Sequence, residues 1–463
     1  MKRAITILAM LIGLSVAGGL WVLRAPDPEA VDTVDWSFVQ QQLASDSTPL
    51  SANTNVVLAV VCTLRKDRLE PYGFHKPTSP FLDALGSNGV ILNRHYTQAP
   101  WTRPSSGSLL TGRWPRALQL DNPGKRSSLS LVLGEEHTTL GEYMANAGHA
   151  TIGSTGNPNL KSQFGLAQGL QQLWEPPNTF KEGHVQVTGH TQVDFLLDAL
   201  ANTPSDQPVY MQAVFTDTHT PRKPALRYLR MFADSLFKPK RRARYHASVR
   251  QVDEVLARLF EGVKRSRPDT LFILANDHGE GLRYPRNHGK GHGNHLYPTT
   301  IGGTSIWHHP GLQSQRTDAL TMNIDIVPTV LGALGLPEGL TDGADLSDGL
   351  KGTGPFPNRA AVFSETYYGK TRKMSAIGPD FQYIRNLRKT KNPSRQEMLF
   401  AHEDSLSIDN VIQDHPGRTE ELSKALDAWD EKMTALWNSA GVPQEVELSA
   451  DTKAQLEALG YLD

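Results

Sequence analysis

The chain alternates between apolar, β-branched runs and segments with helical periodicity, and this alternation constrains its fold more than any other feature. Residues 56–61, 209–215 and 271–275 read VVLAVV, VYMQAVF and LFILA, which is typical of buried strands. Between such runs, apolar side chains recur at helical spacing, as in residues 249–260. This order predicts an α/β fold, a three-layer sandwich in which a large, mostly parallel sheet carries helices on both faces.

Residues able to bind a metal ion or to transfer protons follow each of these strands directly. The strand ends carry Cys62, then Asp217 with His219, then Asp277 with His278. In open α/β sheets, ligands bind beyond the carboxyl ends of the strands. A single Asp or His after a strand is more often a turn or cap residue, so it is the clustering that indicates a catalytic site.

Composition narrows the class of protein. The chain has 463 residues, of which 38% are hydrophobic, enough for one large domain with a smaller appendage. Its formal net charge of -1 and pI near 7.0 lack the basic footprint of nucleic-acid binding, so we expect no nucleic acid as a partner. Cys62 is the only cysteine, which excludes a disulfide within the chain.

The N-terminus predicts contact with a membrane. Residues 4–23 are uncharged and long enough to span a bilayer as a helix, and Lys2 and Arg3 favour a cytoplasmic N-terminus. We therefore expect residues 1–24 to be a membrane anchor or a signal, with the anchor favoured. The body would then be extracytoplasmic (periplasmic or extracellular), or secreted if the segment is cleaved. Residues 25–54, rich in Pro, Asp, Ser and Thr, are interpreted as a linker.

A hydroxyl side chain precedes a predicted helix in APWTRPSSGSLLTGRWPRA, residues 99–117. Pro104 suits the first turn of that helix and Gly112 suits its end. Thr102 then lies at a helix N-terminus, where free N–H groups and the dipole attract an anion. Its hydroxyl could attack a phosphorus or sulfur centre, or it could serve only as the helix N-cap. The residues alone leave both interpretations open.

This stretch resembles the signature of the sulfatase family, in which Cys or Ser is followed by x-P-S-R, an apolar pair, T-G-R and x-P. Thr102 falls at the nucleophile position. Further stretches resemble other family motifs in order: CTLRKDRLEPYG at 62–73, TTLGEYMANAGHATIGSTGNPNL at 138–160, NDHGEGL at 276–282, GHGNHLY at 291–297 and IDIVPTVLGALGLP at 324–337. The resemblance implies an alkaline-phosphatase-like fold for a catalytic domain over 55–340.

The remaining residues, 341–463, are predicted to form a small C-terminal α+β subdomain of the kind that the family carries. AAVFSETYY at 360–368 and DFQYIRNLRKT at 380–390 indicate strands, and TEELSKALDAWDEKMTALW at 419–437 indicates an amphipathic helix. The ending AQLEALGYLD resembles the frequent L-x-x-L-G-Y terminus of the family.

Thr102 departs from the family pattern, because threonine cannot be converted to formylglycine as the cysteine of type I sulfatases is. Threonine is, however, the nucleophile in other branches of the superfamily, such as nucleotide pyrophosphatases and phosphoethanolamine transferases. The resemblance therefore implies hydrolysis of a sulfate or phosphate ester by an unmodified hydroxyl. An alternative is transfer of a phospho-group to a lipid or glycan acceptor.

Cys62 is the second departure, since it stands where the family has a metal-binding Asp. The resemblance implies one divalent metal ion held by Cys62, Thr102, Asp277 and His278. A thiolate is a softer ligand than a carboxylate, so it favours Zn²⁺ at this site and disfavours Ca²⁺ and Mg²⁺. Mn²⁺ is a further alternative. Two alternatives are a catalytically weakened binding protein, and a cysteine that is only a small buried hydrophobe.

Further roles follow from the resemblance. His219 is expected to approach the oxygens of the substrate, a small anionic ester or a charged glycan or lipid. His292 is expected near the leaving group, where it could act as general acid. Arg65 and Asn157 are expected to bind the substrate's anionic group or to support its binding. Other histidines are expected at the surface or in loops, namely His288, His295, His308 and His309.

Overall fold

The computed structural model describes residues 34–45, 48–123, 129–176, 189–285, 288–404, 406–459 and 461. The predicted anchor or signal lies outside these residues, as do residues 25–33, 46 and 47 of the predicted linker. The other residues of the predicted linker are described, and they include a helix at Trp36–Leu43 that buries Val39 and Leu43. Within the described ranges, the structure contains no helix whose length and hydropathy suit a membrane span.

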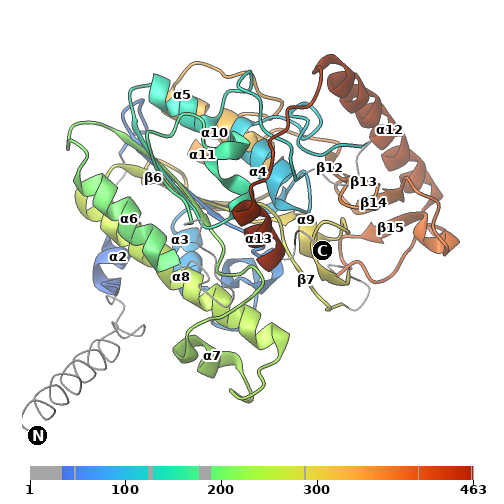
Figure 1. The fold of residues 1–463 in the computed structure, drawn as a ribbon, viewed down its shortest axis with the longest axis horizontal. Coiled ribbons are helices and arrows are strands. Elements are labelled where there is room, and N and C mark those ends of the chain that lie inside the picture. Colours follow the sequence, from blue (N-terminus) through green and yellow to red (C-terminus); the bar gives the residue numbers. More distant parts are fainter. Residues whose placement is uncertain are drawn as a thin grey trace, which may run out of the picture.

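A nine-stranded sheet forms the centre of the described structure (Figure 1). Its strands are β1 Asn55–Val61, β2 Val90–Tyr96, β3 Ala150–Thr155, β4 Gln172–Trp174, β5 Val209–Phe215, β6 Thr270–Ala275, β9 Gly302–Gly303, β10 Ser305–His308 and β11 Gln315–Met322. They lie in the order β11-β2-β10-β6-β1-β5-β3-β4, with β9 paired to β2. Strands β6, β1, β5, β3 and β4 are parallel neighbours, as are β2 and β11, whereas β10 is antiparallel to both β2 and β6. The predicted mostly parallel sheet is confirmed.

Helices cover both faces of this sheet because its strands bury alternate side chains on opposite sides. One cluster joins Val57 and Ala59 of β1 to α2 Trp36–Leu43, α3 Pro80–Ser87, α6 Gly189–Ala201 and α8 Arg241–Ser266. The other cluster joins Val56 and Leu58 to α4 Thr102–Thr111, α5 Leu140–Asn146, α10 Ile326–Leu334 and α11 Ser347–Lys351. The result is the predicted three-layer sandwich.

Shorter elements surround the carboxyl ends of the central strands. They are α7 Leu226–Phe232, which packs against α8, α9 Pro298–Ile301, and a two-stranded ribbon of β7 Gly281–Leu282 and β8 Lys290–Gly291. Single 3-10 turns occur at Lys66–Arg68, Glu70–Tyr72, Pro158–Leu160, Ser162–Phe164, Asn323–Asp325 and Pro393–Arg395.

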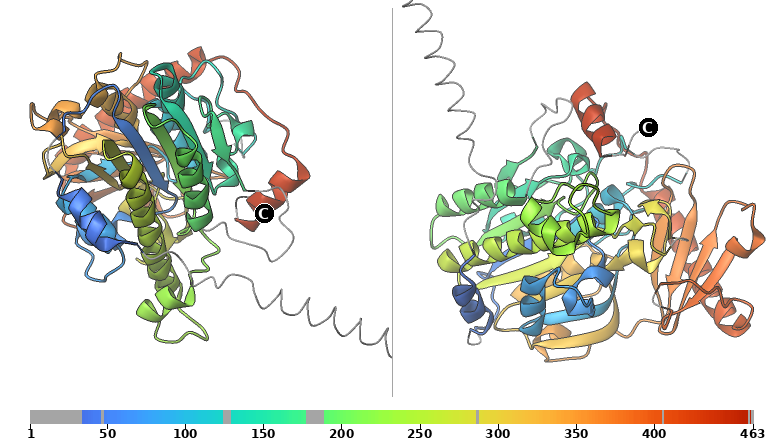
Figure 2. Two further views of the ribbon diagram at one scale, coloured as in Figure 1. Left: turned by 90° about the vertical axis from the view of Figure 1, so that its left-hand side faces the viewer. Right: turned by 90° about the horizontal axis from the view of Figure 1, so that it is seen from below.

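A small antiparallel sheet forms the predicted C-terminal subdomain at one end of the molecule (Figures 1 and 2). Its strands, in order, are β12 Val362–Thr366, β13 Lys373–Ile377, β14 Phe381–Asn386 and β15 Glu397–Ala401, and α12 Pro416–Ser439 packs on it. Helix α13 Ala450–Ala458 lies apart from this sheet, against the large domain (Figure 1). There Leu456 and Tyr461 pack with Trp101, directly before α4.

Candidate active site

Two neighbouring strands and one helix bring the predicted site residues together. β1 and β6 are paired in parallel with Val60 opposite Ala275, so Cys62 and Asp277 follow at the same edge of the sheet. α4 begins at Thr102 beside them. Thr102 Oγ1 lies 3.2 Å from His278 Nε2 and 3.7 Å from Cys62 Sγ. Residues predicted from three separate segments of the chain therefore form one cluster.

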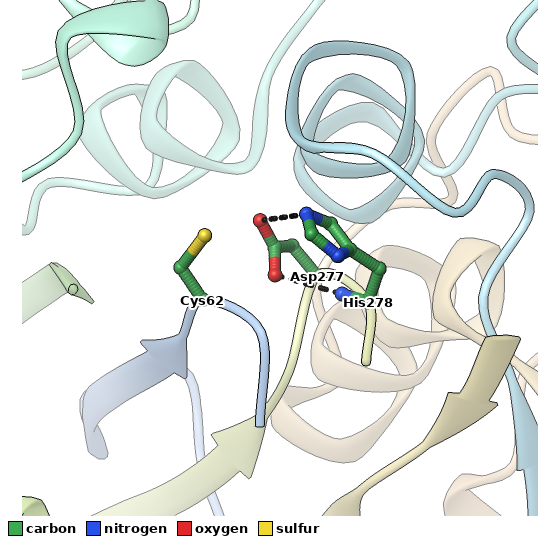
Figure 3. Close-up of side chains that lie close together, drawn as sticks. All are labelled: Cys62, Asp277 and His278. Carbon is green, nitrogen blue, oxygen red and sulfur yellow. Dashed lines mark hydrogen bonds and ion pairs between the residues drawn. The ribbon is translucent and has the colours of Figure 1, made fainter. Parts of the chain in front are cut away.

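Cys62, Asp277 and His278 have the geometry of a metal site (Figure 3). One donor atom from each lies within 4.8 Å of the other two. The Oδ1 atom of Asp277 accepts the backbone N–H groups of Thr63 and His278, at 3.1 and 2.7 Å. Its Oδ2 atom is buried and has no hydrogen-bond donor in the described part of the chain, with His278 Nε2 3.4 Å away. A cation would satisfy this buried oxygen.

The backbone turn after β1 is held in an uncommon conformation. Thr63 has φ 61°, in the left-handed region that a β-branched residue rarely adopts. Its N–H donates to the Asp277 carboxylate, and its side-chain oxygen lies 3.2 Å from Thr218 Oγ1. Such strain persists only where surrounding contacts enforce it, and it is common at functional sites.

The thiol of Cys62 keeps its proton unless a cation binds. Burial and the neighbouring Asp277 carboxylate raise the pKa of this thiol well above its usual value. Metal binding displaces the proton of a coordinating thiol. The sulfur, imidazole nitrogen and carboxylate oxygen present here form a donor set that fits Zn²⁺ better than Ca²⁺ or Mg²⁺.

Thr102 does not cap its helix with its side chain. Helix α4 begins at Thr102 and Trp101 is its N-cap, without a side-chain capping bond. The predicted C-terminal residue Gly112 is confirmed as a left-handed C-cap with φ 70°. The Thr102 hydroxyl instead faces His278 and the phenol of Tyr461, with 2.7 Å between the two oxygens. The interpretation of Thr102 as only an N-cap is therefore wrong.

The histidines predicted to act on the substrate lie beside this cluster. The ring centre of His292 is 4.5 Å from that of His278 and 5.2 Å from that of His219. Burial lowers the pKa of His219 to about 3 and that of His278 to about 4, so both rings are neutral near pH 7. His292 is partly buried, and its Nδ1 atom lies 3.9 Å from Glu280 Oε1.

Hydrogen bonds fix the tautomer of two of these rings. The Nδ1 atom of His278 lies 2.8 Å from the carbonyl oxygen of Gly279, and that of His219 lies 2.6 Å from the carbonyl oxygen of Thr220. A carbonyl oxygen can only accept, so Nδ1 carries the proton in each neutral ring. The Nε2 atoms of both rings, which face the site, are therefore acceptors.

Arg65 and Asn157 differ in their placement. Asn157 donates from Nδ2 to Cys62 Sγ over 3.5 Å, within the cluster. Arg65 forms two bonds to the Asp67 carboxylate, of 2.8 and 2.7 Å, and donates to the carbonyl oxygens of Glu280 and Tyr284. These contacts suit the support of the segment after His278 more than direct binding of an anion.

Tyr461 is a site residue that the sequence analysis did not single out. Its side chain is 6% exposed, and its hydroxyl lies 2.7 Å from Thr102 Oγ1 and 3.2 Å from His219 Nε2. Tyr461 belongs to the C-terminal segment AQLEALGYLD, which resembles the family's C-terminus. No sequence pattern predicts that this segment contacts Thr102 and His219, which are more than two hundred residues away. Among the other histidines, the expectation of a surface or loop position is wrong for His308, which lies in strand β10 and is 1% exposed. His288 and His309 lie in connecting segments, as expected, but are buried there.

A cation-lined pocket opens next to His219, and we call it the His219 pocket. It has a volume of about 380 Å³ and is lined by Thr220, Pro221, Arg222, Lys223, Pro239, Arg241, Arg244 and Lys290. These lining residues include five cations and no acid. The Arg222 guanidinium forms a 2.6 Å ion pair with buried Glu280, which ties the pocket to the segment that carries His278. Such a lining attracts anions.

Residues 54–336, more than half of the chain, match the sulfatase family. The chain belongs to the sulfatase family. This sulfatase-family chain is 24% identical to arylsulfatase A of Homo sapiens over 392 residues, which cover 70% of this chain and 73% of the relative. The predicted family is thus confirmed.

Two solved structures are similar to this family member. The phosphonate monoester hydrolase of Agrobacterium radiobacter matches with a TM-score of 0.66 and 18% identity over 86% of this chain and 98% of that one. A protein solved in complex with its substrate, D-glucosamine-2-N,6-O-disulfate, matches with a TM-score of 0.66 and 14% identity over 83% and 98%. At identities this low, the similarity shows a shared fold.

Proposed function

We propose that this protein hydrolyses a sulfate or phosphate ester, with the Thr102 hydroxyl as nucleophile and one divalent metal ion held by Cys62, Asp277 and His278. The observation that carries the proposal is the position of Thr102. Its hydroxyl is free of helix capping and lies within 3.2 Å of His278 Nε2 and 3.7 Å of Cys62 Sγ. When bound, the ion would lower the pKa of the hydroxyl and polarise the ester oxygens.

The hydrogen bonds around Thr102 give its proton a path. Because His219 Nε2 is an acceptor, the Tyr461 hydroxyl donates to it, which leaves the Tyr461 oxygen free to accept from Thr102. In this chain of hydrogen bonds Thr102 donates to Tyr461, and Tyr461 donates to His219. The Thr102 proton therefore points away from the metal-binding atoms. The Thr102 lone pairs are left to attack the ester.

The start of α4 suits the anionic oxygens of the substrate. Helix α4 presents its positive end at Thr102, so negative charge that develops beside the nucleophile is stabilised there. The ring centre of His292 lies 4.5 Å from that of His278 and 5.6 Å from that of Tyr461, and its Nδ1 atom lies 3.9 Å from Glu280 Oε1. At this position His292 could donate a proton to the leaving oxygen.

The substrate class follows from charge. The His219 pocket is lined by five cations, of which Arg222 is paired with Glu280, so the ester is carried by an anionic molecule, such as a charged glycan or lipid headgroup. The sulfatase-family match and the similarity to a phosphonate monoester hydrolase support both sulfur and phosphorus centres. The uncharged run at residues 4–23 supports action outside the cytoplasm, with the protein attached to a membrane or secreted.

A catalytically weakened, anion-binding protein is the second candidate, and one observation favours it. Cys62 replaces the expected carboxylate, and its raised thiol pKa opposes metal binding at neutral pH. Two measurements on the full-length chain separate the candidates. Elemental analysis gives the metal bound per chain, and a screen of aryl sulfate, phosphate monoester, phosphate diester and phosphonate gives the turnover. A hydrolase needs both to be positive, whereas an anion-binding protein shows no turnover with any of the four esters.

A further inference from the structure

A second cation-lined cavity lies on another side of α8, and we call it the Arg68 cavity. It has a volume of about 410 Å³. It lies between the segment of 3-10 turns after β1 and the α7–α8 connection. Its lining residues are Arg68, Phe74, His75, Lys76, Phe232, Asp234, Ser235, Lys238, Lys240, Arg242, Ala243, His246 and Tyr284.

Two residues that line this cavity each carry a buried nitrogen atom without a hydrogen-bond partner in the described ranges. Arg68 is 9% exposed and its Nε atom is unpaired, while His246 is 6% exposed and its Nε2 atom is unpaired. The Arg68 Nε–H group can only donate, so it requires an acceptor. A buried polar atom without a partner destabilises the fold, so its occurrence in two residues that line one cavity indicates a ligand.

The positive charge of the cavity is only partly compensated. Its one acidic lining residue, Asp234, forms a 3.0 Å ion pair with Lys240. The ion pairs of the described residues leave Lys76, Lys238 and Arg242 without an acidic partner. Burial and the neighbouring cations Arg68, Lys76 and Arg242 lower the pKa of His246 to about 3. The cavity therefore carries excess positive charge in the free protein.

Aromatic rings form the remaining wall. The Arg242 guanidinium lies 4.9 Å from the centre of the Tyr284 ring, and that of Arg68 lies 5.2 Å from the Phe74 ring. The His246 ring packs at 5.1 Å from Phe74. Cation–π contacts attract the guanidinium groups to these rings, and guanidinium groups match the geometry of tetrahedral oxyanions. Flat apolar rings beside them suit a sugar or another ring that carries the anion.

The Arg68 cavity is distinct from the His219 pocket. Arg241 and Arg244 line the pocket, whereas Arg242 and His246 line the cavity. Successive residues of an α-helix are rotated by about 100°, so these two pairs project from different sides of the first turns of α8. Neither hollow includes a residue of the proposed metal site.

We propose that the Arg68 cavity binds the sulfate or phosphate group of an anionic ligand, at a site separate from Thr102. The group accepts the Arg68 Nε–H and is flanked by Arg242, Lys76 and Lys238. This inference does not depend on hydrolysis by the protein, because it concerns binding alone.

The test measures binding of four probes to the full-length chain by isothermal titration calorimetry: inorganic sulfate, inorganic phosphate, glucose 6-sulfate and glycerol 3-phosphate. The variant K238Q/R242Q removes two exposed cations of the cavity rim and should leave the fold intact. Its affinity for the anions that the wild type binds should fall by about tenfold or more. Arg230→Gln, which removes an exposed cation of α7 outside both hollows, is the matched control and should bind as the wild type does.

The four probes separate the sources of the anion. Tighter binding of glucose 6-sulfate than of inorganic sulfate indicates a sulfated sugar, and tighter binding of glycerol 3-phosphate than of inorganic phosphate indicates a phosphorylated headgroup. Equal affinity of K238Q/R242Q and wild type for every probe would overturn the proposal, as would the absence of binding at millimolar concentrations. Turnover of a small aryl ester should be unchanged in K238Q/R242Q. If no ester is turned over by the wild type, the proposed function fails while the binding result stands.

Discussion

The phenol oxygen of Tyr461 lies 2.7 Å from Thr102 Oγ1, so the C-terminal end of the chain is hydrogen-bonded to the proposed nucleophile. The same hydroxyl lies 3.2 Å from His219 Nε2, and the two rings stack with centres 5.5 Å apart. Cys62 and Thr102 are both 0% exposed in this arrangement. Tyr461 therefore contributes directly to the proposed site.

Replacing Tyr461 with Phe should lower kcat by about five- to tenfold. The substitution keeps the ring stacked on His219 but removes the hydroxyl that joins Thr102 to His219, and one such hydrogen bond is worth about 1 kcal/mol. KM should change little, because the ring is not part of the cationic pocket. Steady-state kinetics of Y461F beside Y143F give the comparison, since the Tyr143 hydroxyl bonds to the Leu340 N–H away from the site. A kcat equal to that of the wild type would show that Tyr461 only packs.

Cys62 variants should differ in metal content. Cys62→Ala removes a donor and should lower the bound Zn²⁺ per chain, while Cys62→Asp should restore an oxygen-rich site that prefers Mn²⁺, Mg²⁺ or Ca²⁺. Elemental analysis after dialysis at pH 7 and at pH 5 checks this. Because a thiolate must lose its proton to bind the metal, the wild type should release its metal at the lower pH. If Cys62→Ala retains metal and turnover like the wild type, Cys62 is packing and not a ligand.

His292 should matter most for esters with poor leaving groups. If it protonates the leaving oxygen, His292→Gln should slow an alkyl ester by about 10²–10⁴-fold and an activated aryl ester, which departs without a proton, far less. Rates for a series of esters of rising leaving-group pKa, with wild type and H292Q measured side by side, give the dependence. An equal loss across the series would instead assign His292 to binding or packing.

Stability should fall as the pH falls through the range in which unfolded histidines take up protons. Burial lowers the pKa of His95 to about 3 and that of His308 to about 4, against about 6.5 in an unfolded chain. Between these values the unfolded chain binds protons that the folded chain does not, so the free energy of unfolding decreases from about pH 6.5 toward pH 4. Each group adds a slope approaching ~1.4 kcal/mol per pH unit.

Thermal melts of the full-length chain at pH 7, 6 and 5 test this dependence. The His95→Gln variant should lose less stability than the wild type over the same interval, because it lacks one titrating group. The control is Gln41→Asn at an exposed position of α2, which adds and removes no titrating group and should leave the slope unchanged. Parallel pH curves for wild type and H95Q would contradict the assignment of a buried neutral ring.

The parts of the fold that carry the site could be predicted because their signals are local. β1, β5 and β6 are continuous apolar runs of the kind that buried parallel strands require, and each was located to within one residue. Since parallel strands end at one edge of a sheet, the convergence of Cys62 and Asp277 followed from their positions.

What could not be predicted depends on contacts between distant segments. Tyr461 meets Thr102 across 359 positions, and no local pattern predicts where a C-terminal tail packs. The Arg65 side chain is taken up by Asp67, two residues away, which its sequence position alone did not reveal. His308 was expected at the surface or in a loop, yet it lies in strand β10 and is buried, with its Nε2 atom 3.2 Å from the Leu43 carbonyl oxygen.

The most direct test of the account is the rate of ester hydrolysis by Thr102 variants of the full-length, metal-loaded chain. Thr102→Ala should lower turnover by about 10³-fold or more, because removing a catalytic nucleophile abolishes the covalent step. Thr102→Ser, which keeps the hydroxyl, should retain measurable activity, and the melting temperatures of both variants should match that of the wild type. Turnover by Thr102→Ala equal to that of the wild type would contradict the account.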